Sequence, residues 1–191
     1  MFFYDVLFSC FTLFYLPILV FKGKAHWGFF CRLGKIPDAV KKRLRERENI
    51  WIHAVSVGEV MLVLELIREL KSRYPGRQIV LTTVTKTGFK LAGNRLSDED
   101  VLLYAPLDFS FSVKEYIRAI QPKLYIVAET EIWPNMLTLI RQAGVPSLIV
   151  NGRISDKAFR RYLRVLFLIR PVVRTLSLAC MQSRIDAERI K

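Results

Sequence analysis

The sequence predicts an α/β fold built on a parallel, Rossmann-like sheet. From residue 50 onward, short apolar runs alternate with longer helical patterns, as expected of repeated β-α-β units. The apolar runs lack the polar–apolar alternation of a half-exposed strand, so we expect helices to cover both faces of the sheet. This region of about 140 residues is long enough for one domain.

The strands are predicted from apolar runs of four to six residues. The run Ile50–Val55 is the first, and Val80 and Leu81 lie at the centre of the second. Pro122 ends the connection that leads into the fourth strand. The six predicted strands are residues 50–55, 78–83, 101–105, 124–128, 147–150 and 176–181.

The first two helices are predicted from the patterns between these strands. A helix is expected from Val60 to about Tyr74, where Pro75 and Gly76 stop it. Thr85–Gly88 is expected to form a loop, which leads into a short helix that ends at Leu96.

The later helices have recognisable start and stop signals. Asp108 or Ser110 is expected to cap the third helix. Pro134 opens the fourth helix, in a position where its missing N–H costs little, and Gly144 ends that helix. Two more helical segments follow the fifth strand, and Pro171 is expected to separate them.

Glu59 is a candidate general base because of where the sequence places it. The first strand stops at Ser56 and Gly58, so Glu59 is expected at the turn into the following helix. In an open parallel sheet, ligands bind at the carboxyl ends of the strands. The alternative is that Glu59 only complements the positive end of the helix dipole.

The first 21 residues form an apolar segment that we interpret as a membrane anchor. Met1–Phe21 contains one charged residue, Asp5, and one proline, Pro17. As a helix it would reach roughly 31 Å, about the thickness of the hydrocarbon core. A helix lying in the membrane interface is the alternative. Basic residues follow this segment, so by the positive-inside rule we expect the rest of the chain to lie in the cytoplasm. These residues are Lys22, Lys24, Lys35, Lys41, Lys42, Arg43, Arg45 and Arg47.

The net charge of +13 predicts an anionic partner, which could be a nucleic acid, an anionic membrane or a phosphorylated substrate. In the segment Phe159–Arg170, arginines stand beside large apolar residues, which suits a lipid interface better than a nucleic-acid duplex. The sequence contains no zinc-finger spacing and no aromatic RNA-binding signature. We therefore expect a membrane partner and no nucleic acid.

The sequence offers no set of metal ligands with a recognisable spacing. Its three cysteines are Cys10, Cys31 and Cys180, with no Cys-x-x-Cys pair. His53 lies near the end of the first strand and is expected to pack or form hydrogen bonds rather than bind zinc. Neither a Gly-x-Gly-x-x-Gly motif nor a P-loop is present, so Lys86–Gly88 is not part of a nucleoside triphosphate loop.

Four blocks of residues, in this order, resemble the N-terminal half of the Kdo transferases, the 3-deoxy-D-manno-octulosonic acid transferases of lipid A assembly. The first block, His53–Glu59, and the second, Thr82–Gly88, each begin within the end of a predicted strand. The remaining blocks are Tyr104–Asp108 followed by Glu129–Asn135, and Asn151–Ser155 followed by Arg161 and Tyr162.

The resemblance implies a glycosyltransferase of the GT-B type, with two Rossmann-like domains and a cleft between them. The N-terminal domain of such an enzyme binds a lipid A precursor, and the C-terminal domain binds the donor CMP-Kdo. The reaction in lipopolysaccharide biosynthesis inverts the anomeric centre and needs neither metal nor other cofactor. The family's proposed catalytic base corresponds to Glu59.

On this basis residues 1–21 are an anchor, 22–49 a basic linker or helix, and 50–191 the acceptor domain of an inner-membrane enzyme that faces the cytoplasm. The donor domain is expected to be missing, and the chain to be a fragment. The acceptor-binding candidates are Ser56, Gly58, Lys86, Thr87, Gly88, Glu129, Glu131, Asn135, Arg153 and Ser155.

Several of these roles have structural alternatives. Glu129 and Glu131 point to the same side of an extended segment, where they could bind the acceptor or bond to the backbone or to Arg153. Arg153 could pair with an acceptor phosphate or with one of these two carboxylates. Trp133 is expected to pack rather than to stack on a sugar.

Two other functions compete with this reading. One is a non-catalytic, membrane-anchored module that binds an anionic lipid and lacks a donor site. The other is a different GT-B enzyme on the same membrane face, such as a peptidoglycan-precursor transferase, although such enzymes lack the block Glu129–Asn135.

Overall fold

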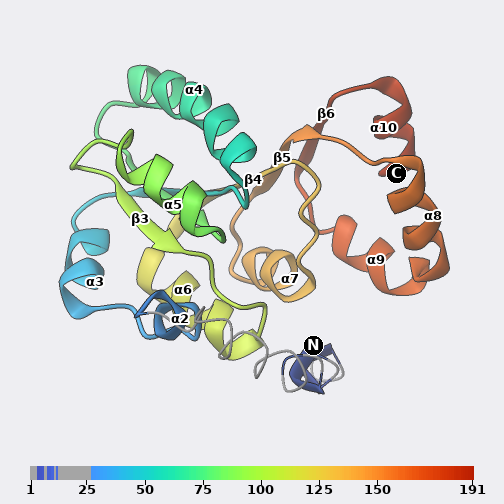
Figure 1. Cartoon of the computed structure of the whole chain (residues 1–191), viewed down its shortest axis with the longest axis horizontal. Helices are drawn as coiled ribbons and strands as arrows, with labels where there is room; N and C mark the ends of the chain where they lie inside the picture. Colours follow the sequence, from blue (N-terminus) through green and yellow to red (C-terminus); the bar gives the residue numbers. More distant parts are fainter. Residues whose placement is uncertain (1–3, 7, 11, 13–26) are drawn as a thin grey trace.

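The chain forms a six-stranded parallel sheet with helices on both faces (Figure 1). The computed structural model describes residues 4–6, 8–10, 12 and 27–191. The strand order is β3-β2-β1-β4-β5-β6. The strands are β1 (Asn49–His53), β2 (Gln78–Thr83), β3 (Val101–Tyr104), β4 (Pro122–Ala128), β5 (Ser147–Gly152) and β6 (Leu178–Met181). The predicted fold class is therefore confirmed for the α/β domain.

Each crossover between neighbouring strands contains at least one helix. Two short helices, α2 (Trp27–Arg32) and α3 (Asp38–Arg45), precede the sheet. The others are α4 (Val57–Arg73), α5 (Lys86–Gly93), α6 (Ser110–Ile120), α7 (Pro134–Gln142), α8 (Asp156–Arg164), α9 (Leu166–Val173) and α10 (Arg184–Arg189).

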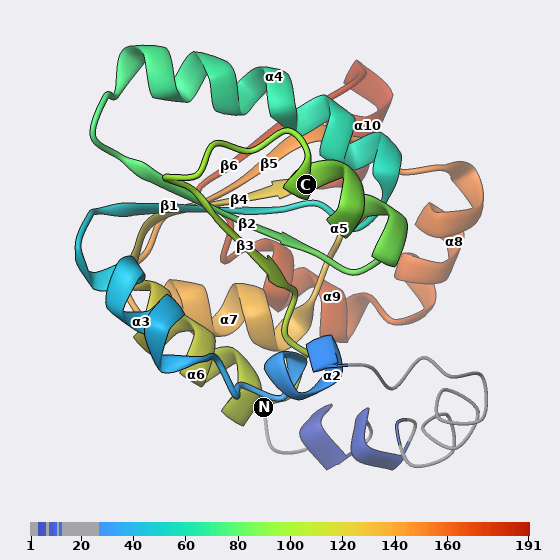
Figure 2. The same cartoon turned by 60° about the vertical axis from the view of Figure 1, so that its left-hand side comes forward.

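Apolar side chains that alternate along the strands form two core layers. Ile50 and Ile52 of β1 pack in the layer beneath α4 and α5. Trp51 lies between them in sequence and packs in the opposite layer, beneath α6 and α7, with Tyr116 and Tyr125. Figure 2 shows α4 and α5 on one face of the sheet and α3, α6, α7 and α9 on the other. Burial on both faces explains why the strand sequences are continuously apolar.

Two predicted boundaries are wrong for identifiable reasons. Thr85–Gly88 is not a loop, because the Thr85 hydroxyl accepts a hydrogen bond from the N–H of Gly88 at 3.1 Å and α5 begins at Lys86. The break after α8 lies at Val165 rather than at Pro171. Pro171 stands inside α9, where the bond from Arg174 N to the Arg170 carbonyl continues the helix beyond it.

The predicted cap of α6 is also wrong, because neither Asp108 nor Ser110 caps this helix with its side chain. The N–H of Ser110 instead donates to the carboxylate of Asp5, 105 positions earlier, at 3.0 Å. Asp108 accepts hydrogen bonds from the backbone N–H groups of Asn135 and Met136, at 3.1 and 2.8 Å. It therefore caps α7, which begins on the neighbouring loop.

Most of the predicted anchor, residues 1–21, lies outside the described residues. Residues 4–6, 8–10 and 12 are helical, and Phe8 packs edge-on against Phe109 at 4.8 Å between ring centroids. Among the described residues, no helix is both long and apolar enough to cross a membrane.

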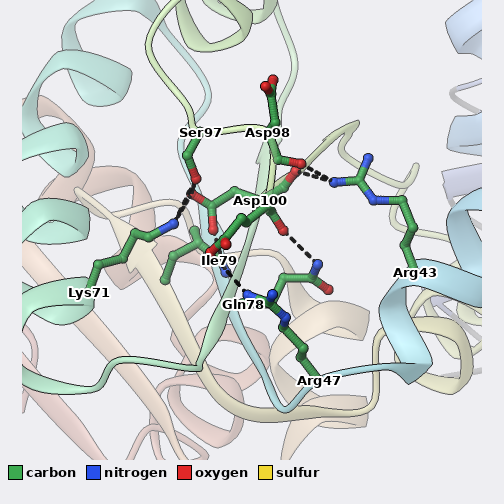
Figure 3. Close-up of polar contacts among 9 residues, drawn as sticks. Arg43, Arg47, Lys71, Gln78, Ile79, Ser97, Asp98 and Asp100 are labelled. Carbon is green, nitrogen blue, oxygen red and sulfur yellow. Dashed lines mark hydrogen bonds and ion pairs between the residues drawn. The ribbon is translucent and has the colours of Figure 1, made fainter.

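A polar cluster holds the segment before β3 against α3, α4 and β2 at the amino-terminal edge of the sheet (Figure 3). The buried Asp100 carboxylate accepts hydrogen bonds from Lys71 Nζ at 2.8 Å, Ser97 Oγ at 2.7 Å and the Ile79 N–H at 3.1 Å. Arg43 donates to the carbonyls of residues 98 and 100. Because both carboxylate oxygens of Asp100 bind donors of the fold, this cluster supports the edge opposite the candidate site.

Candidate functional site

The strand order locates the candidate site at the carboxyl ends of β1 and β4. From β1 the chain proceeds to β2 and β3 on one side, and then returns to β4 on the other side of β1. The order therefore reverses between β1 and β4, which is where ligands bind in open parallel sheets. The loops that meet there are residues 54–56, which lead into α4, and residues 129–133, which lead into α7.

Glu59 lies at this point, in the first turn of α4 rather than in the turn before it. Its carboxylate accepts hydrogen bonds from the N–H of Val55 at 2.8 Å and of Ser56 at 3.2 Å. Ser56 in return accepts the N–H of Glu59, which completes a capping box. Glu59 is 5% exposed. The helix-capping alternative is thus part of its role, although each carboxylate oxygen retains acceptor capacity for another proton donor.

Lys86, Thr87 and Gly88 form the first turn of α5, at the carboxyl end of β2. Lys86 and Thr87 are exposed, whereas Gly88 is buried. A Cβ atom at Gly88 would lie 2.8 Å from the hydroxyl oxygens of Thr83 and Thr85. Glycine at this position therefore lets the start of α5 approach the loop that carries Ser56.

The structure brings Glu129 and Glu131 to the same place as Glu59. Glu129 adopts a left-handed backbone conformation, with φ of 56°. Glu131 accepts a hydrogen bond from the indole N–H of Trp133 at 2.9 Å. Burial raises the pKa of Glu131 above its usual value, and the negative charges of Glu59 and Glu129 raise it further. The charges of Glu59 and Glu129 thus act on Glu131 at the reversal point of the sheet.

The rings of His53 and Trp133 pack against each other next to these carboxylates. Packing is the role that the sequence predicts for both residues. Their rings are perpendicular, with centroids 6.0 Å apart. His53 is 2% exposed, and its Nδ1 lies 3.1 Å from the Thr82 hydroxyl. Burial, with a smaller contribution from the charge of Arg32, lowers the pKa of His53 to about 4. The imidazole is therefore neutral at pH 7.

Among the remaining candidates, two have roles in holding the fold together that the sequence does not indicate. Asn135 is buried, and its amide N–H donates to the Asp108 carbonyl and the Asp5 carboxylate. Ser155 caps α8 by accepting the Ala158 N–H. Arg153 is exposed and makes no ion pair with a described residue, so the predicted alternative of a salt bridge to Glu129 or Glu131 is not formed.

Comparison with known proteins assigns the chain to a family. A family model described as 3-deoxy-D-manno-octulosonic-acid transferase (Kdo transferase) matches residues 28–191. The chain belongs to the Kdo transferase family.

Relatives from several bacteria agree with this assignment. A Kdo transferase of Haemophilus influenzae is 37% identical over 142 residues, which is 74% of this chain and 33% of the relative. A bifunctional glycosyltransferase/methyltransferase of Fusobacterium nucleatum is 36% identical over 149 residues, which is 77% of this chain and 23% of the relative. The chain thus spans between about a quarter and a third of the length of these relatives.

A solved structure supports the fold. The Acinetobacter baumannii MurG structure matches with a TM-score of 0.51 at 13% identity, and the match covers 71% of this chain and 41% of that protein. At this identity the likeness concerns the fold alone.

Sequence reasoning missed residues whose contacts join segments far apart in the chain. The Thr130 hydroxyl accepts the Arg153 N–H at 2.9 Å and donates to its carbonyl at 2.7 Å, which joins the loops after β4 and β5. Arg32 is largely buried, and its Nε donates to the Ala105 carbonyl at 3.0 Å. Asp5 could have been recognised from the sequence, because it is the single charged residue of an apolar segment.

The candidate site contains three carboxylates, those of Glu59, Glu129 and Glu131. In the described part of the chain, no group of three or more His, Cys, Asp or Glu side chains could hold a metal ion. Chemically, the candidate site can accept a proton at Glu59 or Glu131. It can also offer exposed donors at Lys86, Thr87 and Arg153.

Proposed function

We propose that this chain is the acceptor-binding part of an enzyme that transfers Kdo from CMP-Kdo to a lipid A precursor, a phosphorylated and acylated disaccharide. The transfer inverts the anomeric centre, uses no metal and belongs to lipopolysaccharide biosynthesis. Family membership supports the reaction class. The enzyme would act at the inner membrane, anchored by its N-terminal segment, with its catalytic face in the cytoplasm.

The observation that carries this proposal is the position of Glu59 at the reversal point of the sheet. Two backbone N–H groups, of Val55 and Ser56, hold its carboxylate in a fixed place. A carboxylate fixed in this way can take the proton of the acceptor hydroxyl as its oxygen bonds to the anomeric carbon of Kdo. The bond from that carbon to the phosphate of CMP breaks, and CMP leaves with the electron pair.

The neighbouring carboxylates are suited to complement this step. Glu131 lies close enough to Glu59 for the two charges to interact, and its raised pKa makes it a stronger base than an ordinary glutamate. Exposed Lys86 and Arg153, on either side of these carboxylates, can pair with the phosphates of the acceptor.

The test is the substitution Glu59→Gln in the complete gene product. We expect Kdo transfer to fall by about 10²–10⁴-fold, the usual contribution of a general base. Glu59→Asp, which keeps the charge but shortens the side chain, should retain more activity than Glu59→Gln.

The matched control is Glu65→Gln on the exposed face of the same helix, where the carboxylate pairs with Arg68. That variant should transfer Kdo normally. Near-normal turnover by a folded Glu59→Gln variant would contradict the assignment of the base and leave Glu59 as a helix cap.

The competing proposal is a non-catalytic module that binds an anionic lipid. It is favoured by the capping bonds of Glu59, which give this residue a structural role without catalysis. Binding of the lipid A precursor with no release of CMP from CMP-Kdo, by the complete gene product, would support this second function.

A further inference from the structure

An apolar groove lies between α8, α9 and α10, beside the candidate site. Its volume is about 340 Å³, within the range of small-molecule pockets. Most of its lining is aliphatic or aromatic, and it includes Ile132, Ile154, Tyr162, Leu163, Leu166 and Ile169. Figure 1 shows these three helices grouped at one end of the sheet, next to β6.

Ile154 at the inner end of the groove is buried in the domain, but the walls that α8 and α9 form are largely exposed. Leu163 is 49% exposed and Leu166 is 43% exposed. Helix α8 buries none of its residues, and α9 buries only Val172. Contiguous apolar side chains that remain uncovered by the fold indicate a binding surface.

The groove begins at the two loops that carry candidate site residues. Ile132 directly follows Glu131, and Ile154 directly follows Arg153. Tyr162 connects the two regions, because it lines the groove and its pKa is raised by burial and then by the charge of Glu131. A ligand in the groove would therefore extend from the neighbourhood of the carboxylates toward α9.

Cationic side chains stand among the apolar ones. Arg170 and Arg174 line the groove and form no ion pair with any residue that the structure describes. Arg189 is already engaged, because it donates to the Ile154 carbonyl and to Asp156 and lies over the Phe159 ring. Glu188 is the one acidic residue of the lining, and it is exposed.

We propose that this groove binds one acyl chain of the anionic lipid acceptor, with Arg170 and Arg174 supplying the counter-charge to its phosphorylated part. An apolar groove whose guanidinium groups pair with no described carboxylate suits a negatively charged amphiphile. This inference rests on the proposed function, since it assigns a subsite to that acceptor. It predicts that the enzyme selects for acylated acceptors through contacts outside the carboxylate site.

The first experiment measures binding of 11-(dansylamino)undecanoic acid, a fluorescent anionic acyl chain, to the 191-residue chain. We expect a saturable rise in fluorescence. Leu163→Glu should weaken binding about tenfold, because it places a charge in the apolar groove. The variant Arg170→Gln/Arg174→Gln should also weaken it. Since all three side chains are exposed, the variants should fold normally, which circular dichroism checks.

The control is Phe167→Ser, on the same helix as Leu166. Phe167 is 76% exposed and does not line the groove, so its substitution should leave probe binding unchanged. Equal losses of probe binding in Phe167→Ser and Leu163→Glu would show that the probe binds a general apolar surface, of the kind that lies on a bilayer, and not the groove. Unaltered binding by Leu163→Glu, or no binding by the unmodified chain, would overturn the inference.

The second experiment compares acylated and deacylated acceptors in the complete gene product. Leu163→Glu should raise KM for the acylated acceptor about tenfold and leave transfer to the deacylated one unchanged. If the unmodified protein transfers Kdo to neither acceptor, the proposed function fails while the probe measurement still decides the groove. If transfer occurs and Leu163→Glu affects both acceptors equally, the groove assignment fails alone.

Discussion

At the scale of single residues, His53 shows how burial sets a charge state next to the site. Its pKa of about 4 lies below the usual 6.5 because burial disfavours the imidazolium, and nearby Arg32 adds to this effect. Because the pKa is lowered in the folded state, His53 contributes stability that is present above pH 6.5 and is lost as the pH falls toward 4.

We therefore expect the His53 ring, followed by NMR, to titrate near pH 4. A His53→Asn variant should lose part of the decrease in unfolding free energy that the unmodified chain shows between pH 6.5 and 4. For a shift of this size the linked free energy is about 3 kcal/mol. A His53 ring that titrates near 6.5 would contradict the burial argument. Asp38→Asn, at an exposed position, is the control that should leave the pH profile unchanged.

At the scale of elements, Asp108 joins the loop after β3 to the start of α7. Its side chain is fully buried, and it accepts the N–H groups of Asn135 and Met136. Burial raises its pKa to about 7, so the carboxyl group is about half protonated at neutral pH. Its proton affinity is higher in the folded state, and its contribution to stability is therefore lost as the pH rises through 7.

Asp108→Ala should lower the unfolding free energy by about 1–2 kcal/mol, because it leaves two buried N–H groups without an acceptor. Asp108→Asn should cost less, since a neutral amide can still accept one of these bonds. Urea unfolding at pH 7 measures both. The control is Asp98→Asn on the exposed loop before β3, which should be neutral. Equal losses from Asp108→Asn and Asp108→Ala would show that the charge itself is required.

Local signals in the sequence were sufficient for most elements. β2 occupies the predicted residues 78–83, because its apolar run is bounded on both sides, and Gly144 ends α7 with a positive φ of 73°. The errors arise where a polar residue serves two roles. Thr85 resembled a loop residue but caps α5, and Asp108 resembled the cap of α6 but caps α7.

The site was partly predictable for a similar reason. Glu59 lies in the first turn after β1, and Glu129 and Glu131 lie in the loop after β4, so their shared position at one edge follows from the parallel sheet. The buried position of Asn135 could not be predicted in this way. Its partners, Asp5 and Asp108, come from 130 and 27 positions away, and only the tertiary fold brings them together.

At the scale of the whole molecule, Asp5 attaches the N-terminal segment to the edge of the sheet that carries the candidate site. Its carboxylate accepts the Ser110 N–H at 3.0 Å and the Asn135 amide at 2.7 Å, at the starts of α6 and α7. Helices that follow parallel strands begin at the carboxyl edge of the sheet. The carboxylate of Asp5 is therefore held at the same edge of the sheet as Glu59.

This arrangement predicts that Asp5→Ala releases the N-terminal segment without unfolding the domain. The unfolding free energy should fall by about 1 kcal/mol, the usual effect of removing a helix cap. Hydrogen exchange at the Ser110 amide should become faster, while amides within β1 keep their protection. Asp38→Ala, at an exposed carboxylate that pairs only with Lys41, should change neither quantity. Unchanged exchange at Ser110 in Asp5→Ala would mean that the start of α6 does not depend on this carboxylate.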